Sequence, residues 1–312
     1  MIDLTRLARD LGMIARRRAE GAGREAEENG GEPHANGRGA AGVSGANGAA
    51  ASRRWNGNGA ANRWIESAAG AFAQESLLDL PGAEVMEVAG EPVFAVRRDV
   101  DELYPEGNVA QAMRSAIERG IMQDSDGPRE LAEVVVLDLE TAGFWGYPLF
   151  VSALLFEEDG RLQTLQLMTR TYSEEGGVVR ATVQILRERP HLVTFNGKSF
   201  DVPFLSERAA YHAIDFDRGA LHHKDLLHPA RKEFRGYFPN CKLKTLERML
   251  LGIRRINDIP SSEIPAVFHE FIATGYLERV RDVLHHSRMD LISTGLLLGK
   301  LGEKVRENAD SA

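Results

Sequence analysis

The chain is 312 residues long, carries a formal net charge of -8 and has 43% hydrophobic residues. This length allows one large α/β domain or two ordinary domains. A single cysteine, Cys241, excludes an internal disulfide, and no secretory signal pattern is recognised near the start. Charged residues interrupt every apolar run well short of the roughly 20 residues that a membrane-spanning helix needs. We therefore expect a cytoplasmic protein without a membrane partner, whose acidic balance argues against binding nucleic acid over the whole surface.

The beginning of the chain differs in composition from the rest. Residues 1–19 place four apolar side chains, from Leu4 to Ile14, on one stripe with arginines opposite, which predicts a short amphipathic helix. Residues 20–63 are rich in Gly, Ala and Asn and have too few large apolar residues to offset the entropy of ordering, so we expect a disordered linker. The helix could dock on the body of the protein, fray or bind a protein partner, and its sequence does not choose among these.

Regular structure is predicted from residue 64 onward. Residues 64–130 contain two short alternating apolar runs separated by Ala89-Gly90, which predicts a small N-terminal extension with a β-hairpin packed on the main domain. The main domain is expected at 131–302 and a flexible tail at 303–312. The apolar run from Val134 to Leu137 is typical of a strand buried on both faces.

The main domain has a regular order of predicted strands and helices. Three strands form a meander, and the tight-turn sequence Glu158-Asp159-Gly160 joins the second to the third. A helix at 177–189 is followed by a fourth strand in HLVTFNG, a helix at 202–213 and a fifth strand at 221–227. Helices follow, including the GLLLGK stretch, which lacks the length and the hydroxyl of a phosphate loop. This order predicts an α/β fold with a mixed five-stranded sheet flanked by helices.

Carboxylates stand at three points of this pattern. Asp138 and Glu140 are separated by one residue at the end of the first strand, so their side chains point to the same side. Such a pair alone is weak evidence, since short motifs often match by chance in surface turns. The fourth strand leads to Asp201 at the same edge of the sheet, and His286 and Asp290 lie four residues apart on one helix face. Hydrolysis of a phosphodiester by two hard cations needs such oxygen ligands and a nearby base.

The stretches around these residues resemble the DEDD-type 3′→5′ exonuclease superfamily, whose members share the ribonuclease H-like fold with the proofreading domains of DNA polymerases. The matching stretches are VVVLDLETAG, VTFNGKSFDVPFL and VLHHSRMDLIS, in the expected order. Together with the intervening KLKTLERMLLGIRRINDIPSSEIP they are similar to the bacterial YprB-type ribonuclease H-like domain. The resemblance covers roughly residues 80–301, which makes it more specific than any single motif.

The resemblance implies a nuclease that releases nucleotides from a 3′ end with two divalent cations, Mg²⁺ or Mn²⁺. The implied metal ligands are Asp138, Glu140, Asp201 and Asp290.

The position of the general base departs from the simplest family pattern. Family members place a Tyr four residues, or a His five residues, before the last aspartate, and here those positions are His286 and His285. Either imidazole suits proton abstraction at neutral pH. In a regular helix His286 shares a face with Asp290, so we favour His286 and keep His285 as the alternative.

Other residues beside the motifs are candidate contacts for the substrate. Thr141 offers a hydroxyl, Gly143 permits close approach of the chain, and Asn196 could hydrogen-bond the sugar or cap the strand. Lys198 lies in the same strand-end loop as Asn196. Phe144 and Trp145 could stack on the last base, although packing within the protein is at least as good an explanation.

Asp225 and a group of basic residues complete the set. Asp225 on the fifth strand could support the metal ligands, but a buried aspartate that caps a loop is the commoner case. Phosphate contacts would explain the basic group, although part of it belongs to the solvated face of a helix. Its members are Arg231, Lys232, Arg235, Lys242, Lys244, Arg248, Arg254 and Arg255.

The leading hypothesis is a metal-dependent 3′→5′ exonuclease that acts on DNA or RNA. One alternative is a structure-specific endonuclease of the same fold. The other is a non-catalytic ribonuclease H-like module that binds nucleic acid or a protein partner, which four clustered carboxylates disfavour. The sequence does not distinguish DNA from RNA, or single from double strands.

Overall fold

A computed structural model describes residues 77–122, 127–128 and 130–310. The amphipathic helix predicted at 1–19 and the linker predicted at 20–63 lie outside these residues. Among the described helices, none combines the length and the apolar character needed to cross a membrane.

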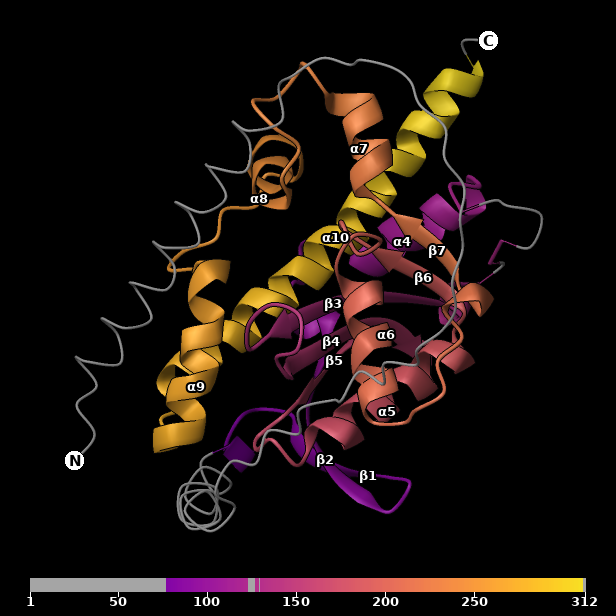
Figure 1. The fold of residues 1–312 in the computed structure, drawn as a ribbon. Helices are drawn as coiled ribbons and strands as arrows, with labels where there is room; N and C mark the ends of the chain where they lie inside the picture. Colours follow the sequence, from indigo (N-terminus) through magenta and orange to yellow (C-terminus); the bar gives the residue numbers. More distant parts are fainter. Residues whose placement is uncertain (1–76, 123–126, 129, 311–312) are drawn as a thin grey trace, which may run out of the picture. The chain divides into compact units, whose positions relative to one another are not determined.

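The centre of the fold is one mixed sheet of seven strands (Figure 1). Their order across the sheet is β1-β2-β5-β4-β3-β6-β7. The pairs β1-β2, β2-β5, β5-β4 and β4-β3 are antiparallel, whereas β6 runs parallel to both β3 and β7. The strands are β1 (Ala83–Val88), β2 (Glu91–Asp99), β3 (Val134–Thr141), β4 (Leu149–Glu158), β5 (Arg161–Met168), β6 (His191–Thr194) and β7 (His222–Asp225).

The prediction of five strands was wrong because the N-terminal hairpin belongs to the same sheet. The hairpin turns at Ala89-Gly90, and its second strand pairs with β5 from Phe94 opposite Met168 to Asp99 opposite Gln163. Without β2, the outer side of β5 would expose unpaired backbone groups at a sheet edge. The sequence pattern indicates the hairpin, but it carries no sign of which strand the hairpin joins.

Helices cover both faces of the sheet, and each face has its own apolar core (Figure 1). On one face, α5 and α6 pack over β3 and its neighbours through Val178 and Phe204. On the other face, α4, α9 and α10 contribute Met113, Phe268 and Leu291. The longer helices are α4 (Val109–Glu118), α5 (Glu175–Glu188), α6 (Asp201–Tyr211), α7 (Leu227–Phe234), α9 (Ile264–Thr274) and α10 (Glu278–Asp310). The last of these continues to Asp310, into the segment expected to be a flexible tail.

Short helical turns fill the connections. Residues 243–251 form a single α-helical turn followed by a π-helical turn that ends at Gly252, whose φ is 73°. A π-helical turn inside a helix is rare and is often found beside functional sites. These turns are α3 (Val100–Leu103), α8 (Leu243–Leu246), η1 (Leu131–Glu133), η2 (Arg218–Ala220), the π-helix η3 (Glu247–Leu251) and η4 (Ser261–Glu263).

The central strand β3 sends alternate side chains into the two cores. Val135 and Leu137 join the core beneath α5 and α6, and Val134 and Val136 join the core beneath α10. Because strand side chains alternate, Asp138 and Glu140 continue the row that faces α10. The register of the strand therefore points its two carboxylates toward the helix that carries the last motif.

Helix α10 packs very closely against α4 through the glycines of the GLLLGK region, which is helical as predicted. A Cβ atom added at Gly299 would lie 2.7 Å from Ala112 Cβ and 3.1 Å from the Ala112 carbonyl oxygen. One added at Gly302 would lie 2.8 Å from Ala116 Cα. All three distances are shorter than ordinary van der Waals contact, so these glycines set the separation of the two helices.

We expect Gly299→Leu to lower the free energy of unfolding by about 1–3 kcal/mol, because the new side chain must push α10 away from α4. Urea unfolding measures this change. The control is Lys300→Leu, since Lys300 is half-buried at the next position and loses only an ion pair with Glu303, which contributes less than about 1 kcal/mol. Equal stability of the two variants would contradict the close packing.

Candidate functional site

Three carboxylates meet where β3 ends and α6 begins. Asp138 and Glu140 lie on β3, and the pairing of this strand with β4 is interrupted by a bulge between Glu140 and Thr141. Such bulges re-aim side chains next to active sites. Asp201 is the first residue of α6, and its Oδ1 accepts a hydrogen bond of 3.0 Å from the backbone N–H of Leu139. That bond ties the second motif directly to the first.

Helix α10 brings the third motif to the same place. His286 Nε2 lies 3.7 Å from Glu140 Oε1 and 3.7 Å from Asp290 Oδ2. The side chain of His286 is only 2% exposed, whereas His285 is exposed on the outer face of the helix. The structure therefore brings His286 to the carboxylates and turns His285 away from them, as the helical period predicts.

These side chains line one cleft of about 530 Å³. Thr141, Gly143, Phe144 and Asn196 lie around it, together with Ser261 and Ser262 from the turn before α9. The cleft thus combines residues from β3, the loop after β6, α6 and α10, which are far apart in the sequence.

Burial and like charge act together on the carboxylates. Burial is the main cause that raises the pKa of Asp138 and of Glu140 well above the ordinary value, and the neighbouring Asp290 and Asp201 raise both further. Burial also raises the pKa of Asp201 to about 7, against the hydrogen bond from Leu139. The cluster therefore resists carrying its full negative charge unless positive charge is supplied.

Arg255 supplies part of that charge. Its guanidinium is 5% exposed and forms ion pairs with Asp290 and Glu247. Burial on its own would lower the pKa of Arg255, but Asp290 and Glu247 raise it above the ordinary value. The side chain of Arg255 therefore stays positively charged, and it lies between Asp290 of the acidic cleft and Glu247 of η3.

Asp258 is a second charged residue that sequence reasoning missed at this site. Its Oδ1 lies 2.8 Å from His286 Nδ1, and Lys244 Nζ lies 2.6 Å from its Oδ2. Burial acts to raise the pKa of Asp258, but Lys244 and His286 lower it below the ordinary value. Both Arg255 and Asp258 stand in RRIND, in the stretch between the second and third motifs. The charges of both residues can be read from the sequence, but the orientation of their side chains depends on how this stretch folds over α10.

The type of donor in the cleft suits a hard divalent cation. Four carboxylates provide only oxygen ligands, and Asp138 Oδ2 is buried without a hydrogen-bond partner among the described residues. An acceptor of this kind is costly unless something binds it. In the described part of the chain, however, no three such side chains are already grouped as a metal site, and Arg255 holds one oxygen of Asp290. The residues fit the ion in chemistry and charge, but they do not form a ready-made shell.

The loop after β6 is shaped by Asp225. Asp225 Oδ1 accepts hydrogen bonds from the backbone N–H groups of Asn196, at 2.8 Å, and Leu227, at 3.0 Å. Its Oδ2 accepts one from the N–H of Lys198 at 3.1 Å. Asp225 therefore caps this loop, and neither it nor Lys198 lines the cleft. Asn196, with a φ of 70°, does line it.

Of the two aromatic residues expected in the loop after β3, only Phe144 lines the cleft. Trp145 packs against Phe200 and Phe204, with ring centroids 6.2 and 6.0 Å apart, and lies outside the cleft lining. Phe144 is 81% exposed and lines the cleft. Gly143 is required because a Cβ atom there would lie 2.7 Å from the ring of Tyr147.

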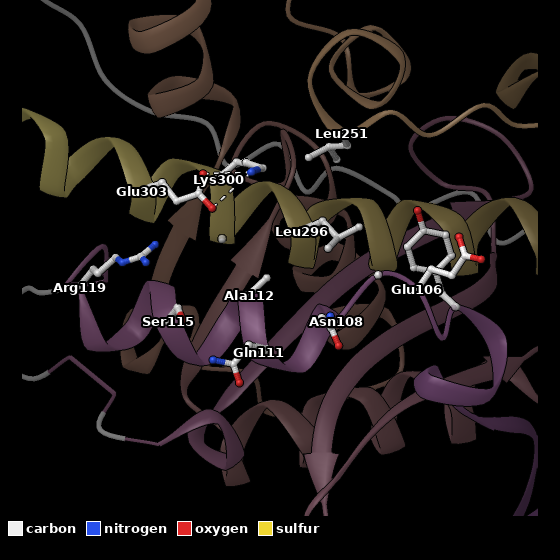
Figure 2. Close-up of a pocket in the computed structure, with 13 residues that line it drawn as sticks. Glu106, Asn108, Gln111, Ala112, Ser115, Arg119, Leu251, Leu296, Lys300 and Glu303 are labelled. Atoms are coloured by element: carbon white, nitrogen blue, oxygen red, sulfur yellow. Dashed lines mark hydrogen bonds and ion pairs between the residues drawn. The ribbon is translucent and has the colours of Figure 1, made fainter.

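A second hollow of about 380 Å³ lies between α4 and α10 (Figure 2). It shares no lining residue with the acidic cleft. Lys300 in this hollow is paired with Glu303 at 3.0 Å, so its charges are partly balanced within the site. Nothing in its lining resembles the group of carboxylates on β3.

Comparisons with known proteins agree with this architecture. A family model described as the RNase H superfamily matches residues 135–302, which is more than half of the chain. YprB, an uncharacterized protein of Bacillus subtilis (strain 168), is 36% identical over 118 residues, which are 36% of this chain and 28% of YprB. The chain thus matches less than a third of the length of that relative.

A solved structure is also similar. The family B DNA polymerase from the hyperthermophilic archaeon Pyrobaculum calidifontis has a TM-score of 0.42 and 19% identity, over 57% of this chain and 28% of that chain. The family match, together with the YprB relative, establishes a nuclease-type fold and confirms the resemblance seen in the sequence. The chain belongs to the RNase H superfamily and contains a YprB-type ribonuclease H-like domain.

Proposed function

We propose that this protein is a metal-dependent nuclease that hydrolyses phosphodiester bonds and removes nucleotides from the 3′ end of DNA or RNA. The observation that carries the proposal is the gathering of Asp138, Glu140, Asp201 and Asp290 in one cleft, where a buried oxygen of Asp138 has no hydrogen-bond partner among the described residues. A binding module has no use for buried carboxylates that repel the phosphate backbone. Bound cations would reverse that repulsion.

The four carboxylates would hold two divalent cations, Mg²⁺ or Mn²⁺. When bound, such ions polarise the phosphate and stabilise the charge that develops on the entering and leaving oxygens. Asp138 offers its free Oδ2, and Glu140 and Asp290 flank His286. Arg255 balances Asp290 on the side away from the cleft.

His286 is the proposed general base. Asp258 accepts the hydrogen bond from Nδ1 and so fixes the tautomer in which Nε2 carries a free lone pair. Nε2 faces Glu140, Asp290 and the hydroxyl of Ser261, which is 3.4 Å away. A water molecule in the cleft could therefore pass its proton to Nε2, while Asp258 stabilises the imidazolium that results.

The rim of the cleft would hold the terminal nucleotide. Phe144 is an exposed aromatic side chain on which a base could stack, and Asn196 offers an amide at the end of the neighbouring strand β6. Thr141 donates its hydroxyl to the carbonyl oxygen of Gly143 at 2.6 Å, so we assign it to shaping the loop. The exonuclease and the endonuclease of the same fold differ on a circular strand, which an exonuclease cannot start to degrade.

We expect Asp138→Asn to stabilise the metal-free protein by about 1–3 kcal/mol, because it removes the burial and like-charge repulsion of the carboxylate that raise the pKa of Asp138. Mn²⁺ should stabilise the wild type, by about 2.7 kcal/mol at a hundred times its Kd, and should not stabilise the variant. Urea unfolding in EDTA and in Mn²⁺ measures both effects. Asp282→Asn, at an exposed position of α10, is the matched control. Equal responses of Asp138→Asn and wild type to Mn²⁺ would refute the assignment of this ligand.

Wild-type protein with Mn²⁺ or Mg²⁺ should release mononucleotides from the 3′ end of a linear strand and leave a closed circular strand intact. Asp201→Asn should lower the rate by at least about 10³-fold, since it removes one metal ligand. The assay uses linear single- and double-stranded DNA and RNA labelled at the 5′ end. Absence of hydrolysis on every substrate would end the nuclease proposal, and cleavage of the circle would favour the endonuclease.

His286→Ala should lower the rate of hydrolysis by about 10²–10⁴-fold, because the base is lost. His285→Ala should stay within about threefold of wild type, since this neighbouring side chain is exposed on the other face of α10. The pair is matched in chemistry and in position, so single-turnover rates of the two variants identify the base. A large loss in His285→Ala with none in His286→Ala would reverse the assignment.

A further inference from the structure

We infer that the basic pocket next to the acidic cleft is a separate binding site for the phosphate backbone of the nucleic acid. The basic pocket is lined by Lys244, Arg248, Ile253, Arg254 and Arg255, together with Glu247 and Asp258, and has a volume of about 620 Å³. The inference rests on the proposed function in that it names where the polymer extends beyond the reacting end.

The charge of this region is opposite to that of the chain. Residues 231–255 carry eight basic side chains and only two acidic ones, Glu233 and Glu247, within a protein of net charge -8. Both carboxylates in the lining of the basic pocket are already neutralised, Glu247 by Arg255 and Asp258 by Lys244. The positive charge that remains belongs to Arg248 and Arg254.

Arg248 and Arg254 are the two lining arginines whose charge is not used within the protein. Both are exposed, and neither has a carboxylate within ion-pair distance among the described residues. Arg187 and Arg279, by contrast, are paired with Asp215 and Glu263. Two free guanidinium groups beside one pocket match the geometry in which arginine binds phosphate through paired N–H donors.

The backbone of η3 explains why the two arginines share a pocket. The π-helical turn ends at Gly252 in the left-handed conformation, and the N–H of Ile253 donates to the carbonyl oxygen of Glu247 at 3.0 Å. The chain therefore folds back immediately after the helix. This reversal returns Arg254 to the side on which Arg248 lies.

The basic pocket and the acidic cleft share a wall. Arg255 lines the basic pocket and forms an ion pair with Asp290 of the cleft, and Asp258 lines the basic pocket and contacts His286 of the cleft. A strand whose end lies in the cleft would thus reach the basic pocket within a short distance along its backbone. Met249 and Ile256, which are 50% and 80% exposed, flank the region and offer apolar contact to sugars.

The test measures binding of labelled oligonucleotides by fluorescence anisotropy in EDTA, with the full chain. Without divalent cations the cleft repels phosphate, so binding reports the basic pocket. The double variant Arg248→Gln/Arg254→Gln should bind about 10-fold or more weakly, and the slope of log K against log salt should fall by about 1 for each arginine. Arg248→Lys/Arg254→Lys should retain most of the salt dependence, since the charge is kept.

Arg161→Gln is the matched control. Arg161 is 71% exposed at the turn between β4 and β5, at the opposite end of the sheet from Asp138, and should be dispensable for binding. Unchanged affinity and salt slope in the double variant would overturn the inference, as would an equal loss in Arg161→Gln. Thermal unfolding of each variant verifies that it folds. Because binding in EDTA involves no hydrolysis, a failed nuclease assay and a failed binding assay are separate results.

Discussion

Burial of carboxylates at the end of β3 is the constraint on which the rest of the site depends. Asp138 and Glu140 continue the row of β3 side chains that faces α10, so the alternation that buries Val134 and Val136 also buries Glu140 and half-buries Asp138. Acids in such a place cannot all carry charge without compensation. Cations from solution and cations from the protein are the two available sources of compensating charge.

The cation from the protein is Arg255, and its position organises the stretch between the second and third motifs. Arg255 binds Asp290 and Glu247 at once, which ties η3 to α10. Asp258, three residues later, turns back to His286 and is held by Lys244. Charged side chains of this stretch therefore form ion pairs and hydrogen bonds with Asp290 and His286 of the acidic cleft. Removing one partner of such a buried pair generally costs more than the pair contributes, so these charges act as a unit.

Hydrogen bonds on one face of the sheet and close helix packing on the other face hold the cleft residues in place. Asp201 accepts a hydrogen bond from the backbone N–H of Leu139, which lies between the two acids of β3. This bond fixes the start of α6 against β3. Asp225 in turn caps the loop that leads into α6. On the other face, Gly299 and Gly302 let α10 approach α4 closely, and α10 carries His286 and Asp290. Small changes in these contacts would move one carboxylate of the cleft relative to the others.

Much of this architecture could be predicted from the sequence, and the reasons are local. Strand alternation places Asp138 and Glu140 on one side, and helical period places His286 beside Asp290 and His285 away from it. The tight turn at Asp159-Gly160 and the family motifs are likewise recognised from residues that are neighbours in the sequence. The family match then confirms the resemblance that those motifs carry.

Tertiary structure alone decided what the charged residues between the motifs contact. The joining of β2 to β5, the capping role of Asp225, the packing of Trp145 on Phe200 and the approach of Arg255 and Asp258 to α10 all join residues distant in the chain. Local patterns carry no record of such partners, because a charged side chain has the same propensity whether it faces solvent or a buried carboxylate. The sequence by itself determined which acids could meet, and the fold determined which cations meet them.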